Sequence, residues 1–149
     1  MRAVVQRVCQ AICEVDGERV GAIDHGLLVF LGIGEGDTQQ ERNYMIEKIL
    51  KLRIFENDEK EMDLDVTEVR GGILVIPQFT LYGDVTRGRR PSFHRAEAPG
   101  PAQKHFQCFL EEMREHHQPV EKGQFAEMMD IRADNDGPVT ILIDSEKAF

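Results

Sequence analysis

Basic residues and cysteines are both scarce in this sequence. The chain carries 18 Lys and Arg against 27 Asp and Glu, a formal net charge of −9, whereas proteins held to nucleic acid mainly through phosphates present many cations on one face. The three cysteines, Cys9, Cys13 and Cys108, make an odd number and lack the paired C-x-x-C spacing of zinc sites. We therefore expect neither a disulfide framework nor a metal site, and we interpret the cysteines as reduced core residues.

Long apolar stretches are missing as well. No run approaches the roughly 20 apolar residues that a membrane span requires, and the N-terminal MRAVVQRVCQ lacks the apolar core of a signal peptide. These absences predict a cytoplasmic protein without membrane contact. The 149 residues, 41% hydrophobic and 30% charged, fit one soluble domain over residues 1–149, without a linker or an internal repeat.

Strand patterns outnumber helix patterns along the chain. Asp16 and Gly17 mark a hairpin turn after the apolar, β-branched stretch at 2–16. Unbroken apolar runs predict buried strands at 26–33 and 73–76. Residues 126–134 and 139–144 alternate like two final strands.

Two stretches have the apolar period of helices. Thr38 and Glu41 have capping-box spacing at the start of the first stretch, and a Pro-Gly-Pro sequence opens the second. The stripes expected to face the core are Met45, Ile46, Ile49 and Leu50, and then Ala102, Phe106, Phe109, Leu110 and Met113 in a helix over 101–117. This order of elements predicts an α+β fold in which two main helices pack on largely antiparallel, curved sheet layers.

No conventional catalytic set emerges from the sequence. A Ser-His-Asp arrangement is missing, and none of the five histidines lies in a recognisable motif. His116 and His117 are neighbours and would diverge on a helix, so we interpret them as a solvated face. The G-x-G-x-G at 32–36 is an unlikely phosphate loop, because Glu35 and Asp37 would stand where the phosphate binds.

The segment PQFTL, at 77–81, interrupts a buried strand. Pro77 cannot continue regular pairing, so the chain should leave the sheet there, and the backbone N–H groups of Phe79 and Thr80 can point at a ligand. Two such donors could bind a developing oxyanion, a role worth about 3–4 kcal/mol per donor in known hydrolases. Thr80 is itself a possible nucleophile, but no base is evident beside it. The simpler alternative is that PQFTL is only the end of a strand.

Two further segments stand out from the pattern. In NDGPVT, at 135–140, Gly137 and Pro138 are typical of a turn before the last strand. The segment at 86–95 gathers basic side chains into ten residues, which is typical either of a solvated loop or of a contact with phosphate or another anion. These basic residues are Arg87, Arg89, Arg90, His94 and Arg95.

Taken together, PQFTL and NDGPVT resemble the D-aminoacyl-tRNA deacylase family, whose signature pairs S-Q-x-T-L with N-x-G-P-x-T near the C-terminus. The resemblance extends over nearly the whole chain. It includes QRV at 6–8, GLLVFLGI at 26–33, KLRIFEN at 51–57, RRPSF at 89–93 and GQFAEMM at 123–129.

The resemblance implies a homodimeric hydrolase that needs no cofactor. It would cleave the ester between a D-amino acid, or glycine, and the 3′-terminal adenosine of tRNA. Gln78 and the backbone amides of Phe79 and Thr80 would hold the ester carbonyl, and the 2′-hydroxyl of the substrate would assist the attack. Phe125 and Met129 would pack around the terminal adenine, consistent with base stacking on apolar side chains.

Handedness would be tested by the Gly137–Pro138 peptide. The resemblance implies that this peptide is cis, enters the site of the partner subunit and offers its carbonyls to the substrate ammonium. It would leave no room for an L side chain, so selectivity would come from exclusion. Asn135 and Arg7 would complete this substrate-binding region, with Arg7 anchoring the cis form. Contacts to the acceptor end of tRNA would come from Arg87, Arg89 and Arg90.

Pro77 departs from the family pattern, which usually has Ser at this position. A paralogous group that acts on some L-aminoacyl-tRNAs resembles the chain here, but Arg7, Phe79 and NDGPVT follow the D-specific pattern. Three alternatives therefore stand beside the D-specific enzyme. They are a deacylase of mischarged L-aminoacyl-tRNA, a non-catalytic nucleic-acid-binding module that uses the arginines at 86–95, and a dimeric interaction protein without a site.

Overall fold

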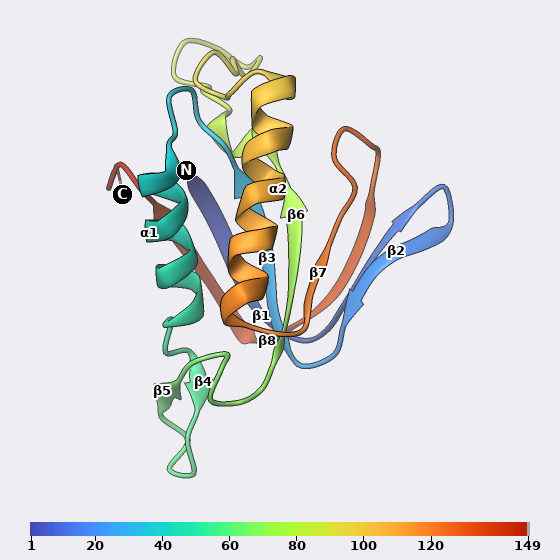
Figure 1. The fold of residues 1–149 in the computed structure, drawn as a ribbon, viewed down its shortest axis with the longest axis vertical. Helices are drawn as coiled ribbons and strands as arrows, with labels where there is room; N and C mark the ends of the chain where they lie inside the picture. Colours follow the sequence, from blue (N-terminus) through green and yellow to red (C-terminus); the bar gives the residue numbers. More distant parts are fainter. Residues whose placement is uncertain (149) are drawn as a thin grey trace.

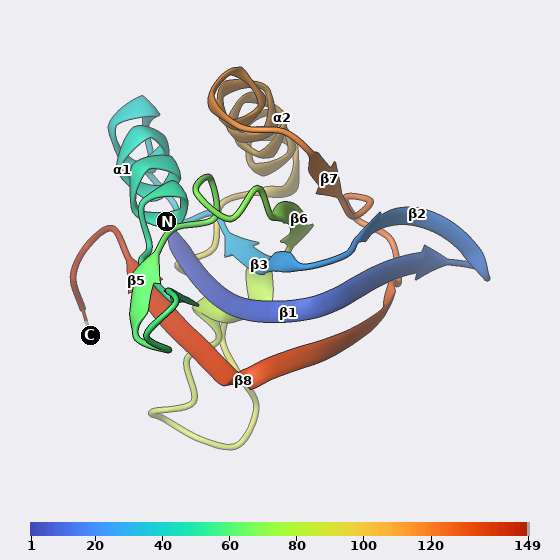
Figure 2. The same ribbon diagram turned by 90° about the horizontal axis from the view of Figure 1, so that it is seen from below.

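A curved mixed sheet carries helices α1 and α2 on one face, as Figures 1 and 2 show from two directions. The computed structural model describes residues 1–148, so Phe149, the last residue of the predicted domain, lies outside the described part. The elements are β1 (Arg2–Val15), β2 (Glu18–Ile23), β3 (Gly26–Gly32), α1 (Gln39–Leu50), β4 (Phe55–Glu56), β5 (Met62–Leu64), β6 (Gly72–Pro77), the 3-10 helix η1 (Phe79–Tyr82), α2 (Pro99–His116), β7 (Val120–Lys122) and β8 (Asp130–Asp144).

Strand β1 is the strand with the most pairing partners in the larger sheet. It pairs antiparallel with β2, β3 and β8. The predicted hairpin turn joins β1 to β2, where Asp16 and Gly17 have φ angles of 50° and 81°, the left-handed values that a two-residue hairpin of this kind requires. The strand order is β2-β1-β3-β6-β7, with β8 added on β1.

Strands β3, β6 and β7 pair in parallel. Both β3 and β6 are buried along nearly all of their length, as their unbroken apolar runs predict, because strands covered on both faces need no polar side. The α+β class with two main helices on a curved sheet is confirmed, and the parallel pairs are a detail that the sequence pattern did not reveal.

Both helices form where their sequences predict them, with α2 at Pro99–His116 against the predicted 101–117 and with Leu50 of the α1 stripe only partly buried. The side chain of Thr38 caps α1 by accepting a hydrogen bond from the backbone of Gln40, and the Glu41 carboxylate bonds back to the Thr38 backbone. The predicted α2 stripe is buried along its whole length. Side chains of both helices form the main core with one face of the sheet. A smaller cluster on the other face includes Val8, Leu28 and Ile76.

The C-terminal strands differ from the prediction. Residues 130–144 form one strand, β8, and NDGPVT lies within it instead of separating two strands. The pairing of β8 with β1 shifts register on both sides of Val8, so the Gly-Pro segment is an interruption inside a ladder that resumes beyond it. Figure 2 shows the sharp bend near the middle of β8.

Two smaller interpretations were wrong. Only Cys13 among the cysteines of the described residues is fully buried, whereas Cys9 is exposed and Cys108 is partly buried. His117 is not part of a solvated face, because α2 ends at His116 and the His117 ring turns inward. Its Nε2 donates a hydrogen bond to the Gly71 carbonyl at 2.7 Å. Within residues 1–148, no helix is long and apolar enough to span a membrane.

Candidate functional site

An apolar cavity of about 410 Å³ opens where the ends of β3 and β6 meet the start of α2. The segment after β7, around Phe125, closes one side of it, and the segment before α2 closes another. Its wall consists of Leu31, Ile33, Pro77, Gln78, Phe79, Phe93, Ala96, Glu97, Ala98, Pro99, Ala102, Phe125 and Ala126. A pocket of this size and apolarity fits the base or ring of a small ligand, since ligand sites span roughly 300–1000 Å³.

The turn η1 stands at the rim of this cavity because Pro77 ends β6. The backbone N–H of Gln78 still bonds to the Leu31 carbonyl at 2.8 Å, and the chain then leaves the sheet. The N–H groups of Phe79 and Thr80 are the first of the 3-10 helix, so they have no partner within it. The break that the sequence predicts at PQFT is therefore present, with two backbone donors at its start.

The side chains of this turn are arranged around the rim. Phe79 is 58% exposed and stacks edge-on against Phe93, with ring centroids 5.0 Å apart. The Thr80 hydroxyl accepts a hydrogen bond from the Gln78 side-chain amide. Because an amide cannot take up a proton from the hydroxyl, this contact does not activate Thr80 as a nucleophile.

The Gly137–Pro138 peptide is cis, and both residues are exposed. Gly137 has a φ of 121°, in the region that favours glycine. A Cβ atom there would lie 2.8 Å from the Val139 side chain and 3.2 Å from Arg7 Nη2. The segment therefore requires glycine both for its backbone angle and for the close approach of Arg7.

Asn135 and Arg7 hold this segment from beneath. Asn135 accepts a hydrogen bond from the backbone N–H of Val139 at 2.9 Å and donates one to the Thr140 hydroxyl at 3.0 Å. Arg7 is buried, donates to the Ile54 carbonyl at 2.6 Å and pairs with Asp136 at 2.9 Å. Both residues thus bond to the protein itself, which makes them supports of the exposed peptide.

The predicted basic residues lie on an exposed loop. Arg87 and Arg90 line a polar hollow of about 370 Å³, together with His94 and Asp84, while Arg89 is exposed but is not part of its wall. Hydrogen bonds from the Thr86 hydroxyl and backbone lower the pKa of Asp84. Asp84 is therefore a carboxylate at neutral pH and opposes anion binding on its side of the hollow.

The cavity brings together only part of the predicted site. Gln78, Phe79 and Phe125 share its wall, whereas Met129 does not belong to it and packs instead toward Gly123 and the smaller core cluster. Among the described residues, the lining of this cavity also lacks the other predicted site residues Thr80, Asn135, Gly137, Pro138 and Arg7. The predicted residues are thus divided among the cavity, the Gly-Pro segment with its supports, and the basic loop.

Sequence reasoning missed the wall that runs from Phe93 to Pro99. Its position is set by backbone bonds to the loop after β3, at Glu35 N to Arg95 O (2.9 Å) and Glu97 N to Ile33 O (3.0 Å). The only local signal was RRPSF, which the resemblance contains and which ends on Phe93. Pairing between segments about 60 residues apart has no signature in either segment alone.

The fold and the cavity define an α+β protein with an apolar cavity beside the first residues of η1. A family model described as D-Tyr-tRNA(Tyr) deacylase matches residues 4–144. The chain belongs to this family of deacylases, as the resemblance in its motifs predicts.

Relatives and solved structures agree with that assignment. The chain is 47% identical to a D-aminoacyl-tRNA deacylase of Thermosipho melanesiensis over 150 residues, with 100% of both chains covered. It is 50% identical to one of Halothermothrix orenii over 149 residues, again with 100% of both covered. The solved structure of a c-Myc DNA Unwinding Element Binding Protein has a TM-score of 0.92 at 41% identity, covering 97% of this chain and 98% of that one. A probable eukaryotic D-amino acid tRNA deacylase shares the fold, with a TM-score of 0.74 at 20% identity, over 95% of this chain and 97% of that one.

Proposed function

We propose that this protein hydrolyses the ester between a D-amino acid, or glycine, and the 3′-terminal adenosine of tRNA. The observation that carries the proposal is the apolar cavity whose wall includes Gln78 and Phe79, with the first two N–H groups of η1, those of Phe79 and Thr80, in the turn that begins there. A terminal base in the cavity would leave the ester at the rim, within reach of these donors. Membership of the deacylase family supports the same substrate class.

The terminal adenine occupies the cavity in this proposal. Phe125 is half-buried, lies near Phe106 with ring centroids 6.2 Å apart, and forms part of the cavity wall, where it would contact the base. Apolar and aromatic walls suit a purine because stacking depends little on hydrogen bonding. Met129, which lies behind Gly123, would act through the shape of this wall and not by touching the base.

The ester carbonyl receives the backbone N–H groups of Phe79 and Thr80. Each donor of this kind stabilises the developing oxyanion by about 3–4 kcal/mol in known hydrolases. Gln78 positions Thr80 through its side-chain hydrogen bond. Assistance from the substrate 2′-hydroxyl, which the family resemblance implies, supplies the proton transfer that Thr80 does not.

Gly137 and Pro138 act in the site of a second subunit. They are exposed on their own chain, and Asn135 and Arg7 hold them in place from within it. A partly exposed apolar row crosses three adjacent strands on the outer face of the sheet, in the order Leu142, Val4 and Phe30. Covering this row with a second copy would bury Leu142, which is 57% exposed, and supports the homodimer that the resemblance implies.

The arginines of the 86–95 loop serve as contacts to the tRNA acceptor end. Arg87, Arg89 and Arg90 are exposed, and the loop leads directly into Phe93 and Ala96 of the cavity wall. A phosphate next to a base in the cavity would therefore find cations close by. Because the net charge is −9, we expect phosphate contacts from this local group of arginines and not from a broad basic face.

The experiment is a deacylation assay with tRNA charged with D-Tyr, Gly, L-Tyr or L-Ala. We expect release of D-Tyr and Gly and retention of L-Tyr. Equal rates on D-Tyr-tRNA and L-Tyr-tRNA would contradict the proposal. Release of L-Ala with retention of D-Tyr would favour the L-specific alternative that Pro77 suggests.

A second candidate function is binding of nucleic acid without catalysis. The observation in its favour is the 41% identity to the solved protein described as a c-Myc DNA Unwinding Element Binding Protein. This function predicts binding of duplex or single-stranded DNA that weakens steeply with salt, because phosphate contacts release counterions. A flat salt dependence would count against it.

A further inference from the structure

Arg2 joins three parts of the chain behind the η1 turn. Its Nε donates to Asp144 Oδ2 at 3.1 Å, at the end of β8. Its Nη1 donates to the Leu81 carbonyl at 3.2 Å, inside η1. Its guanidinium lies over the ring of Tyr82, 4.7 Å from the centroid. One side chain thus binds a carboxylate, a backbone carbonyl and an aromatic face at the same time.

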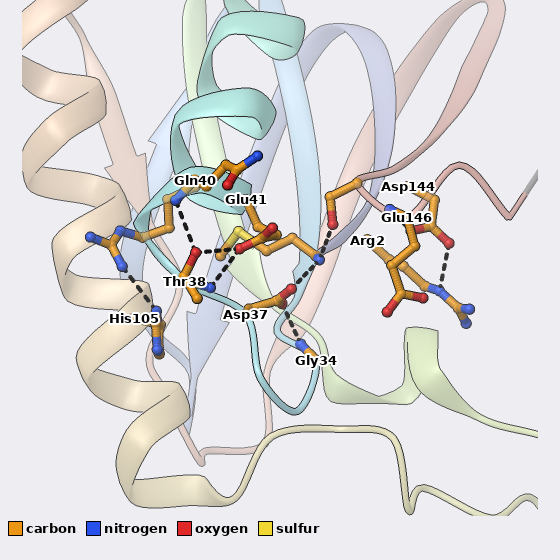
Figure 3. A network of polar contacts seen from close by, with 12 residues as sticks. Arg2, Gly34, Asp37, Thr38, Gln40, Glu41, His105, Asp144 and Glu146 are labelled. Atoms are coloured by element: carbon orange, nitrogen blue, oxygen red, sulfur yellow. Dashed lines mark hydrogen bonds and ion pairs between the residues drawn. The ribbon is translucent and has the colours of Figure 1, made fainter.

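The carboxylate partner of Arg2 is fixed in turn. Asp144 is buried, and its other oxygen accepts the backbone N–H of Glu146 at 2.8 Å. Figure 3 shows Arg2 and Asp144 facing each other beside the loop that carries Asp37. Because both oxygens of Asp144 are engaged, the carboxylate has a single orientation in which Arg2 can meet it.

Tyr82, the last residue of η1, links Arg2 to the turn through its ring. It is 3% exposed, and a Cβ atom on Gly34 would come within 2.4 Å of its hydroxyl oxygen. Gly34 is held by its N–H bond to Asp37 Oδ2 at 2.6 Å, which Figure 3 also shows. The Tyr82 ring is therefore enclosed between Arg2 on one face and the loop after β3 at its tip.

We propose that Arg2 is a positioning residue, which orients the η1 turn so that the Phe79 and Thr80 N–H groups point at the ester carbonyl. The inference rests on the proposed function for the role of these two donors. The new claim is that the Arg2 guanidinium, through its contacts with Leu81 and Tyr82, sets the direction of the Phe79 and Thr80 N–H groups. Lysine cannot replace it, because an ammonium lacks the planar fork that reaches two acceptors and also stacks on a ring.

The test is the variant Arg2→Lys, which keeps the charge and loses the fork. Hydrogen exchange of the two turn amides that donate hydrogen bonds within this segment, Leu81 N–H to the Gln78 carbonyl and Gly83 N–H to the Thr80 carbonyl, should become about tenfold faster, with the rest of the sheet unchanged. On D-Tyr-tRNA, kcat should fall about 10- to 100-fold and KM should stay within about twofold, because the donors act on the transition state. The matched control is Arg53→Lys, since Arg53 forms an exposed pair with Asp63 at 2.6 Å, beside the β4–β5 hairpin.

Each result decides the proposal. Unchanged kcat, or a rise in KM alone, would overturn it, and so would faster exchange spread evenly over the sheet, which indicates general destabilisation. If the wild-type protein released no amino acid from any charged tRNA, the proposed function would fail, and the exchange data would still show whether Arg2 orders the turn. Should Arg2→Lys not fold, Tyr82→Leu removes the stacked ring while Arg2 is kept, and it should give the same local exchange and the same fall in kcat, whereas unchanged values would overturn the proposal.

Discussion

The PQFTL and NDGPVT segments both place a proline at an interruption of a strand, but the structure uses the two interruptions differently. At Pro77 the strand ends, and η1 turns over the end of β3, where a Cβ atom on Gly32 would lie 3.0 Å from the Gln78 carbonyl oxygen. At Pro138 the strand continues, and the interruption is exposed to solvent with side chains beneath it. The first segment thus borders a cavity of its own chain, and the second is exposed on the surface, where the proposed function assigns it to the site of a second subunit.

This difference indicates how the proposed site is divided between two copies of the chain. The cavity and the η1 donors lie within one chain. The Gly-Pro peptide is supported by Arg7 and Asn135 and does not line that cavity. Base binding should therefore belong to one chain, and hydrolysis should need two. The following predictions separate these two requirements.

The largest effect is expected from Leu142→Lys. A lysine in the exposed apolar row should prevent pairing of two copies, and hydrolysis of D-Tyr-tRNA should fall roughly 100-fold or more because half of the site is lost. Binding of adenosine 5′-monophosphate to the cavity should be unaffected. Sedimentation velocity and a binding titration measure the two properties. Met62→Lys is the matched control, since Met62 is 56% exposed and lies in β5, away from the row. A fully active monomer would contradict the division of the site.

Gly137→Ala should have the next largest effect. The positive φ and the close approach of Val139 together cost about 2–3 kcal/mol of unfolding free energy. Gly36→Ala is the control, because Gly36 also has a positive φ, 81°, but nothing lies within 4 Å of its Cβ position. That variant should lose only about 1 kcal/mol. Urea denaturation measures both, and equal losses would mean that contact with Val139 and Arg7 does not shape the segment.

Phe125→Ala should change the other region, with a smaller effect. Loss of one stacking surface should raise KM for D-Tyr-tRNA about tenfold and leave kcat within about twofold, because the base is bound equally in the ground and transition states. The control is Met128→Ala, since Met128 is 90% exposed and is not part of the cavity wall. A fall in kcat without a rise in KM would place Phe125 at the chemistry and not at the base.

The same contrast explains what the sequence could predict. The capping box of α1, the Asp16-Gly17 hairpin and the α2 stripe are all local patterns, in which neighbouring residues determine the outcome, and each is present. The end of β6 at Pro77 was also predictable, because proline lacks the N–H that a ladder requires.

The predictions that failed concern features that depend on contacts between residues far apart in the sequence. The residues of NDGPVT are typical of a turn, yet pairing with β1 keeps 130–144 in one strand on both sides of it. His117 is buried through a bond to Gly71, and the cavity wall at Phe93 depends on pairing with the loop after β3. None of these contacts leaves a periodic signal, so the fold class and the two motifs were predictable, while the continuous strand β8 and the cavity wall at Phe93 were not.

The smallest effect is expected from Thr80→Ala, which tests the chemistry of the turn alone. The Thr80 hydroxyl accepts its hydrogen bond from the Gln78 amide, and no base partner of it is described in residues 1–148. If the turn acts through its backbone, alanine keeps both N–H donors, and the rate on D-Tyr-tRNA should stay within about threefold of the wild type. A loss of about 1000-fold or more in a protein that is still folded would instead make the hydroxyl the nucleophile. Gln78→Ala is the companion variant: it keeps the hydroxyl and both N–H donors and removes only the side-chain amide, so its rate reports what Gln78 contributes by positioning Thr80, separately from the hydroxyl.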